Sequence, residues 1–212
     1  MTTVLIDYGA GNLHSAQKAF ERMAAETGAG AVTVTADPEA VAKATRIVLP
    51  GDGAFPACRS ALAEIPGLED ALRDAVEVRG QPFLGICVGM QMMAREGLEY
   101  EPTPGLGWID GRVEKIAPSD PTLPVPHMGW NDLVISRPHP VLEGLATGDH
   151  AYFVHSWAMV MGDESQRLAH ADYGGPVTAI VGRDNMVGTQ FHPEKSQSAG
   201  LRLIANFLTW TP

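Results

Sequence analysis

The fold of this sequence is decided by one stretch, Phe83-Leu84-Gly85-Ile86-Cys87-Val88-Gly89-Met90-Gln91. It begins as an apolar run, passes through a Gly-x-Cys-x-Gly pattern and continues into helix-forming residues. This order predicts a buried strand, a sharp turn and a helix, the arrangement called a nucleophile elbow, with cysteine in place of serine. Small residues at Gly85 and Gly89 leave room for the turn. The backbone N–H of Val88 is placed to stabilise an oxyanion.

The sequence around Cys87 separates it from the other cysteine, Cys58. A free cysteine is most often buried and inert, and we interpret Cys58 in that way because its neighbours carry no such pattern. The helix expected after Cys87 would aim free N–H groups and a partial positive charge at the sulfur, which favours a thiolate. Gln91 lies one helical turn further on, so its amide can face the same pocket. We therefore predict that Cys87 is a nucleophile.

A histidine and a glutamate near the C-terminus form a second pattern, His192-Pro193-Glu194. Proline at position 193 restricts His192 to extended backbone angles. In an extended segment residues two apart share a face, so His192 and Glu194 are expected to point the same way. The carboxylate can then hold one ring nitrogen while the other faces a thiol, as in a catalytic triad. No local feature shows that His192 reaches Cys87; the pairing of the two patterns suggests it.

The arrangement of apolar segments predicts an α/β fold with a mostly parallel sheet flanked by helices. In the first half we expect strands at 4–6, 32–34, 47–49 and 83–86 and helices at 13–25 and 68–78. In the second half we expect antiparallel strands added to that sheet, at 108–113, 152–154, 157–160 and 177–181. A strand at 187–191 and a helix at 198–210 close the chain, and the Pro-rich stretch 118–126 forms a surface loop. We expect one domain over residues 1–212.

Composition excludes several classes of function. The chain has 212 residues and a formal charge of −10, which argues against nucleic acid as a main partner. It has two cysteines and neither a Cys-x-x-Cys nor a His-Glu-x-x-His pattern, so we expect no disulfide framework and no metal site. No apolar run approaches the roughly 18 residues that a membrane span requires. We expect a cytoplasmic protein that needs no cofactor.

Six segments, distributed in order along the chain, together resemble the class I glutamine amidotransferases, which release ammonia from glutamine through a Cys-His-Glu triad. They are 7–13 (DYGAGNL), 50–55 (PGDGAF), 85–91 (GICVGMQ), 126–131 (PHMGWN), 152–156 (YFVHS) and 190–196 (QFHPEKS). Within that family the resemblance narrows to the glutaminase subunits of imidazole glycerol phosphate synthases, the group that serves histidine biosynthesis. The resemblance covers the whole chain.

The resemblance implies a role for each matching residue. Cys87 would be the nucleophile, His192 the general acid and base, and Glu194 the orienting carboxylate. L-Glutamine would be held by Gly51, Gly53, Val88, Gln91 and the backbone around His155 and Ser156. The loop at 51–53 would supply a second oxyanion donor after a peptide flip. No metal or organic cofactor is implied.

The resemblance also implies a partner. Ammonia would pass to a cyclase, which is a separate (β/α)8 barrel that makes imidazole glycerol phosphate and AICAR, in a 1:1 heterodimer. The surface toward that barrel would include Asn12, His127, Met128, Trp130, Asn131 and Lys195. Asn12 has an equally good alternative role as the N-cap of the helix that starts at Leu13.

One residue departs from the family pattern: Asp52 stands between Gly51 and Gly53, where an apolar residue, commonly valine, is usual. Either its side chain faces solvent and only the backbone matters, which we favour, or the carboxylate opposes negative charge on the oxyanion.

Three other functions stay open at this stage. A triad amidotransferase for another acceptor, such as a pyridoxal phosphate synthase glutaminase, is disfavoured by segments 7–13 and 126–131. A non-catalytic scaffold would have no need to keep all three triad residues. A dinucleotide-binding module would need glycine at position 14, where the chain has His14.

Overall fold

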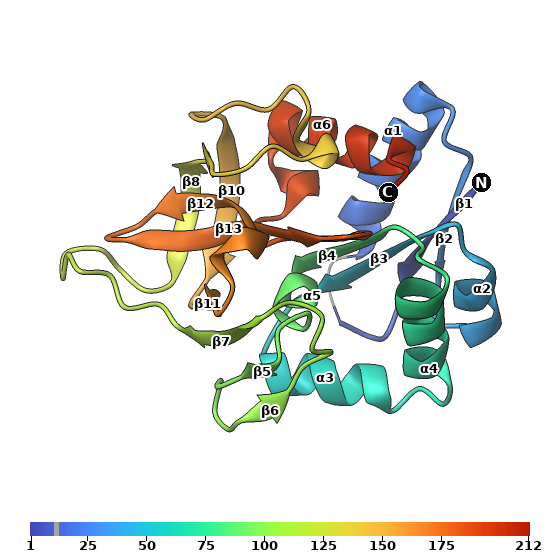
Figure 1. The fold of residues 1–212 in the computed structure, drawn as a ribbon, viewed down its shortest axis with the longest axis horizontal. Helices are drawn as coiled ribbons and strands as arrows, with labels where there is room; N and C mark the ends of the chain where they lie inside the picture. The colour runs from blue at the N-terminus through green and yellow to red at the C-terminus, as the bar shows by residue number, and fades with distance from the viewer. Residues whose placement is uncertain (11–12) are drawn as a thin grey trace.

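An eight-stranded sheet runs through the middle of the computed structural model, which describes residues 1–10 and 13–212 (Figure 1). Its strand order is β2-β1-β3-β4-β14-β13-β12-β9. The five strands from β2 to β14 are parallel, and the remaining three are antiparallel. The bounds are β1 Thr2–Ile6, β2 Ala31–Thr35, β3 Arg46–Gly51, β4 Phe83–Cys87, β9 Val134–Ile135, β12 Arg167–Asp172, β13 Pro176–Arg183 and β14 Met186–Thr189.

Helices cover both faces of the parallel part of the sheet. Helices α1 (Leu13–Thr27) and α6 (Gln197–Thr209) lie together on one face, and α3 (Phe55–Ala63) and α4 (Leu68–Arg73) lie on the other (Figure 1). The short helix α2 (Pro38–Lys43) packs beside α4. Buried strands alternating with helices are what the sequence predicted, and β4 places Cys87 at the carboxyl end of a central strand. Ligands of such sheets bind at that edge.

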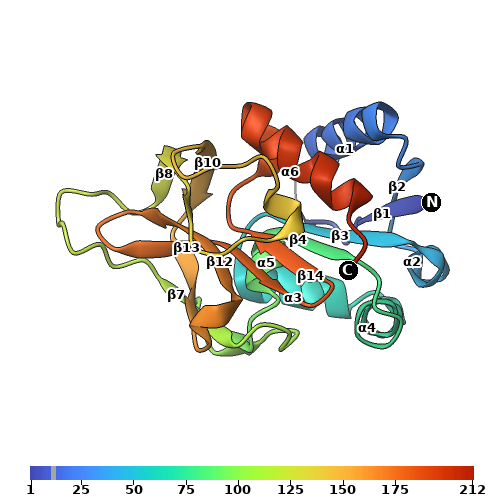
Figure 2. The same ribbon diagram turned by 45° about the horizontal axis from the view of Figure 1, so that its top comes forward.

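Two smaller sheets lie against the main sheet, with β8 and β10 beside its antiparallel strands and β5 and β6 near α3 (Figure 1 and Figure 2). One pairs β8 (His127–Asp132) with β10 (His150–His155). The other has the order β11-β7-β5-β6, formed by Trp157–Met161, Gly111–Lys115, Glu96–Gly97 and Thr103–Pro104. The added strands are antiparallel as predicted, apart from the parallel β5–β7 pair, but only β13 of the predicted ones joins the main sheet.

Several predicted bounds are wrong. The strand expected at 108–113 starts only at Gly111, because Trp108 and Ile109 lie in the core with both N–H groups bonded to the Met93 carbonyl. The strand expected at 187–191 ends at Thr189. The helix expected at 68–78 changes after Arg73 into a π-helical turn, η1 (Asp74–Val78). Helices α2 and α3 and strands β8 and β12 were not predicted.

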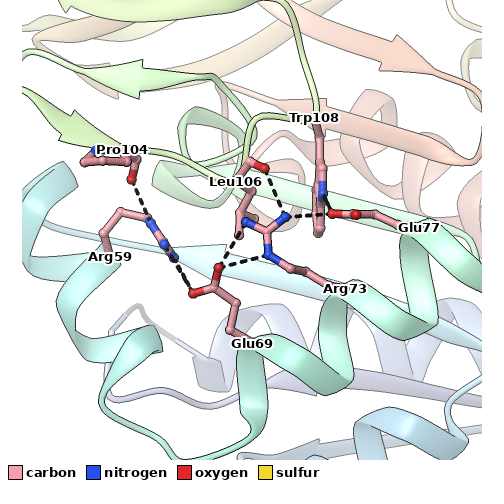
Figure 3. A network of polar contacts seen from close by, with 7 residues as sticks. All are labelled: Arg59, Glu69, Arg73, Glu77, Pro104, Leu106 and Trp108. Atoms are coloured by element: carbon pink, nitrogen blue, oxygen red, sulfur yellow. Dashed lines mark hydrogen bonds and ion pairs between the residues drawn. The ribbon is translucent and has the colours of Figure 1, made fainter.

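A network of arginine and glutamate side chains joins α3, α4 and η1 to the loop that leads into β7 (Figure 3). Glu69 of α4 accepts hydrogen bonds from Arg59 at 3.2 Å and from Arg73 at 3.0 Å. Arg73 also bonds Glu77 at 2.7 Å, and Glu77 accepts from the Trp108 indole N–H. The network fixes this loop on the face of the sheet opposite α1 and α6.

Candidate active site

The backbone of Cys87 has the strained geometry of a nucleophile elbow. Its φ of 55° and ψ of −113° lie in a region that residues with a side chain rarely adopt. Strand β4 ends at this residue, and the helix α5 (Val88–Gln91) begins at the next. The turn therefore presents the thiol at the sheet edge.

The two glycines that flank the nucleophile are required by close backbone contacts, as predicted. A Cβ on Gly85 would lie 2.6 Å from the Gly89 carbonyl oxygen, and one on Gly89 would lie 1.8 Å from the Leu49 carbonyl oxygen. A third close contact lies beneath the neighbouring loop, where a Cβ on Gly51 would be 2.7 Å from the Gly89 nitrogen. A side chain at Gly85 would push the start of α5 away from β4, and one at Gly89 or Gly51 would push it away from β3.

The helix that follows Cys87 is short. Helix α5 has four residues and is followed by turns, so an extended helix dipole does not point at the sulfur. The local contribution remains, because the first N–H groups of a helix have no partner within it. Val88 is the first residue of α5, so its N–H belongs to this set.

His192 and Glu194 form a buried pair. His192 Nδ1 lies 2.9 Å from Glu194 Oε1, and the two side chains are 9% and 3% exposed. His192 is extended, with φ −89° and ψ 103°, as Pro193 predicts. Glu194, however, lies in a 3-10 turn (Pro193–Lys195) rather than in the extended segment that we expected, and the Lys195 N–H closes that turn on the His192 carbonyl at 3.0 Å.

The surroundings of His192 favour its protonated form. Burial lowers the pKa of the imidazole, but hydrogen bonds to the Cys87 and Glu194 side chains and their negative charges raise it to about 10. Glu194 Oε2 is buried and has no hydrogen-bond partner in the described part of the chain, so the carboxylate depends on His192 for its charge balance. His192 therefore stands between the thiol and the carboxylate as an imidazolium.

A cleft of about 480 Å³ opens in front of Cys87. Its size falls in the range of small-molecule sites. Most residues predicted to bind glutamine line it, namely Gly53, Val88, Gln91, His155 and Ser156. Asp52, Glu99, Tyr100, Lys115, Pro126, Val154 and Trp157 complete the lining. The structure thus brings together residues from both halves of the sequence around the sulfur.

Two of the lining side chains have little left to offer a ligand. Gln91 Nε2 donates to the Trp157 carbonyl at 2.9 Å and to Gln190 Oε1 at 3.1 Å, which uses both of its N–H groups. His155 bonds the Trp157 carbonyl through Nδ1 at 2.9 Å and His127 through Nε2 at 3.2 Å. The groups left to bind a ligand are therefore the side-chain oxygen of Gln91 and the backbone of His155.

The loop at 51–53 is held from below by two side chains. The Tyr8 hydroxyl donates to the Pro50 carbonyl at 2.7 Å, and the Cys58 thiol donates to the Asp52 carbonyl at 3.6 Å. Burial raises the pKa of Cys58 to about 11, in line with its interpretation as an inert thiol. Asp52 itself is exposed, as the preferred interpretation of its side chain requires, but it also lines the cleft in front of Cys87.

The residues expected to face a partner divide between the two faces of β8. Met128 and Trp130 point outward and are 62% and 47% exposed. His127 is buried on the inner face, next to a partly buried Asn131. Lys195 is partly buried. Asn12, the remaining residue of this set, lies outside the described residues.

Sequence reasoning missed Gln190, Trp157 and Tyr8, which hold the site from behind. Gln190 was quoted only as part of a motif, and its side chain is fully buried with Nε2 3.8 Å from Cys87 Sγ. Within the described residues, no group of three or more His, Cys, Asp or Glu side chains could hold a metal ion. None of the described helices is long and apolar enough to cross a membrane.

The sheet, the elbow and the buried His–Glu pair place the molecule among α/β proteins that carry a cysteine on a nucleophile elbow. The chain belongs to the glutamine amidotransferase class-I family, whose family model matches residues 4–210. Over the full length of both chains, it is 69% identical to the imidazole glycerol phosphate synthase subunit HisH of Cereibacter sphaeroides. It is 58% identical to the protein of that name in Rhodospirillum rubrum, again over both full lengths.

Solved structures agree on the fold. A crystal structure described as glutamine amidotransferase superposes with a TM-score of 0.72 at 24% identity, covering 97% of this chain and 96% of that one. A glutamine amidotransferase from Thermotoga maritima superposes with a TM-score of 0.63 at 14% identity, covering 92% of this chain and 76% of that one. The solved structures confirm the predicted fold class, and the family model and the full-length relatives confirm the predicted family.

Proposed function

We propose that this chain is the glutaminase component of an imidazole glycerol phosphate synthase and acts in histidine biosynthesis. It hydrolyses L-glutamine to glutamate and ammonia and delivers the ammonia to a cyclase subunit. The observation that carries the proposal is that His192 bonds both Glu194 and Cys87, and that Cys87 lines the cleft. The full-length relatives of the chain bear that synthase's name.

The reaction follows from the charges at the site. The Cys87 thiolate attacks the side-chain amide carbon of glutamine and forms a tetrahedral oxyanion. The C–N bond then breaks, the His192 imidazolium protonates the leaving nitrogen, and ammonia departs from a γ-glutamyl thioester. His192, now neutral, removes a proton from water as the water attacks the thioester. The C–S bond breaks, and glutamate leaves with the thiolate restored. Glu194 keeps Nδ1 protonated and the ring in place throughout.

Substrate recognition is assigned to the groups that line the cleft. The free carbonyl oxygen of Gln91 is an acceptor, suited to the α-ammonium of glutamine. Glu99 and Lys115 line the same cleft and provide opposite charges for a zwitterionic amino acid. Backbone N–H groups of Val88 and of the 51–53 loop would stabilise the oxyanion, and each such donor is typically worth ~10²–10³ in turnover.

The partner is a (β/α)8-barrel cyclase in a 1:1 heterodimer, which makes imidazole glycerol phosphate and AICAR. Met128 and Trp130 supply exposed large apolar side chains on the outer face of β8, the composition expected of an interface centre. Lys195 and Asn12 belong to the same proposed surface. A cytoplasmic location and a single domain over residues 1–212 form part of the proposal.

Replacing Cys87 by alanine tests the proposal. With a cyclase partner from a close relative, Cys87→Ala abolishes glutamine-dependent synthesis, whereas synthesis from added ammonia continues, because the cyclase keeps its own site. Both are measured as imidazole glycerol phosphate formed. Cys58→Ser is the matched control: its hydroxyl can still donate to the Asp52 carbonyl beneath the 51–53 loop, so it keeps glutamine-dependent synthesis. Glutamine turnover above a few per cent of the wild-type rate in a clean Cys87→Ala preparation would refute the assignment of the nucleophile.

A further inference from the structure

One backbone carbonyl, that of Trp157, fixes the orientation of the amide groups behind the nucleophile. A carbonyl oxygen can only accept hydrogen bonds. Gln91 must therefore turn its nitrogen toward the Trp157 oxygen, 2.9 Å away. The second N–H of the Gln91 nitrogen donates to Gln190 at 3.1 Å, so the acceptor must be the side-chain oxygen of Gln190. This leaves the Gln190 nitrogen facing Cys87 Sγ at 3.8 Å.

A second series of hydrogen bonds leads from the Trp157 carbonyl, and the direction of each bond in it is also fixed. His155 must donate from Nδ1 to the Trp157 oxygen, which makes its Nε2 the acceptor in a neutral ring. His127 then donates from Nδ1 at 3.2 Å, and its own Nε2 accepts from the Asn131 amide at 3.2 Å. Each bond has one possible direction. The Trp157 carbonyl is thereby held on both sides and cannot turn away from Gln91.

The position of Gln190 on the backbone is also fixed. Its N–H donates to the Ala179 carbonyl of β13 at 2.8 Å, and its side chain is fully buried. It lies two residues before His192. The sulfur of Cys87 is thus approached by an imidazole that must give up its proton during the reaction and by an amide that cannot.

We propose that Gln190 is a positioning residue for the nucleophile, whose amide N–H, oriented from the Trp157 carbonyl through Gln91, donates to Cys87 Sγ. The inference rests on the proposed function of Cys87. The amide donor gives the thiolate a hydrogen bond that does not depend on the proton of His192. It also keeps the sulfur in place while the neutral His192 activates water for hydrolysis of the thioester. A hydrogen bond from a neutral amide to a charged acceptor is stronger than one between neutral groups.

The rate at which iodoacetamide alkylates Cys87 measures this donor directly, because the thiolate is the species that reacts. Gln190→Met removes both the donor and the bond to Gln91. Gln190→Glu keeps an oxygen for Gln91 and places a second oxygen, not an N–H, beside the sulfur. Mass spectrometry follows the Cys87 and Cys58 peptides separately in the full chain. We expect both variants to slow Cys87 alkylation at neutral pH by about tenfold or more and to move its pH profile to higher pH.

Thr189→Val is the matched control. It removes a buried hydrogen bond, from Thr189 Oγ1 to the Phe191 carbonyl at 3.0 Å, at the residue just before Gln190, but Thr189 has no group on the sulfur. Its Cys87 alkylation profile is expected to match that of the wild type. If folded Gln190→Glu and Gln190→Met also match the wild type within twofold, the positioning role is refuted while Cys87 remains the nucleophile. If wild-type Cys87 reacts no faster than Cys58, the proposed function and this inference both fail.

Discussion

Two polar networks in this molecule are built on opposite principles. Behind the cleft, hydrogen bonds between uncharged groups form two branches that meet at the Trp157 carbonyl: His155, His127 and Asn131 on one side, Gln91 and Gln190 on the other. Burial lowers the pKa of His127 and of His155 to about 4, which keeps both rings neutral at physiological pH. Under α3 and α4, the other network consists of charged arginines and glutamates whose side chains are between 13% and 40% exposed (Figure 3).

The charged network allows many hydrogen-bonding geometries, whereas the neutral network allows only one. A guanidinium offers five N–H groups and a carboxylate several acceptor sites, so the charged network keeps its attraction through small rearrangements. In the neutral network each group has one orientation, set by its neighbour. The neutral network can therefore fix the positions of Cys87 and of the residues that line the cleft. The charged network holds helices and a loop together without fixing the orientation of single groups. Four substitutions or conditions test this contrast.

The largest effect is expected at Glu194, the buried carboxylate that bonds His192 beside the neutral network. Glu194→Gln keeps the shape but removes the negative charge that protonated His192 requires. By analogy with triads that lose this carboxylate, glutaminase turnover should fall by about 10²–10⁴. The pKa of His192 should also fall, because the carboxylate and its hydrogen bond raise it. Steady-state kinetics and an NMR titration of the ring check both. An unchanged His192 titration would contradict the geometry.

A break in the neutral network is expected to cost both stability and activity. His127→Leu fills the same space but leaves His155 Nε2 without its donor, and a buried unsatisfied acceptor costs about 1–3 kcal/mol. Because His155 lines the cleft through its backbone, the KM for glutamine should rise as well. Urea unfolding and glutaminase kinetics measure the two effects. His139→Leu is a suitable control, since His139 is a partly buried histidine outside this network.

Acidification should weaken the protein through the same two histidines. Their folded-state pKa of about 4 lies below the unfolded value of about 6.5, so the unfolded chain takes up protons first as the pH falls. Their contribution is present above pH 6.5 and is lost toward pH 4. His192, with its raised pKa, acts in the opposite sense: its contribution is present below pH 6.5 and is lost as the pH rises toward 10. Between pH 7 and pH 5 the wild type should lose about 1–2 kcal/mol more than His127→Leu.

Some of the site could be predicted from the sequence because its causes are local. The close backbone contacts at Gly85 and Gly89 impose the Gly-x-Cys-x-Gly pattern, and Cys87 is strained as that pattern indicates. The His192–Glu194 pair was also predicted, but for a partly wrong reason. Pro193 does keep His192 extended, yet the carboxylate returns to the ring through a 3-10 turn.

The features that were missed depend on residues far apart in the chain. Helix α3 begins at Phe55 without a local N-cap, and its first N–H is bonded by Glu99 at 2.8 Å, a residue 44 positions away. Strand β8 buries His127 and exposes Met128 and Trp130, which reverses the usual alternation of apolar and polar faces. The Gln190–Gln91 bond joins residues 99 positions apart. No spacing in the sequence indicates these contacts.

The smallest effect is expected in the charged network, at Glu69. Glu69→Gln removes the carboxylate that Arg59 and Arg73 share, but each arginine keeps a backbone carbonyl, that of Pro104 at 3.0 Å or of Leu106 at 3.2 Å. Partly exposed ion pairs contribute about 0–1 kcal/mol, and salt screens them. Urea unfolding should therefore show a loss of about 1 kcal/mol or less at low salt that shrinks at about 1 M salt. Glutaminase kinetics should not change, because the surviving bonds still hold the loop. A loss of turnover as large as that of His127→Leu would mean that the charged network also orients the cleft, and the contrast between the two networks would not stand.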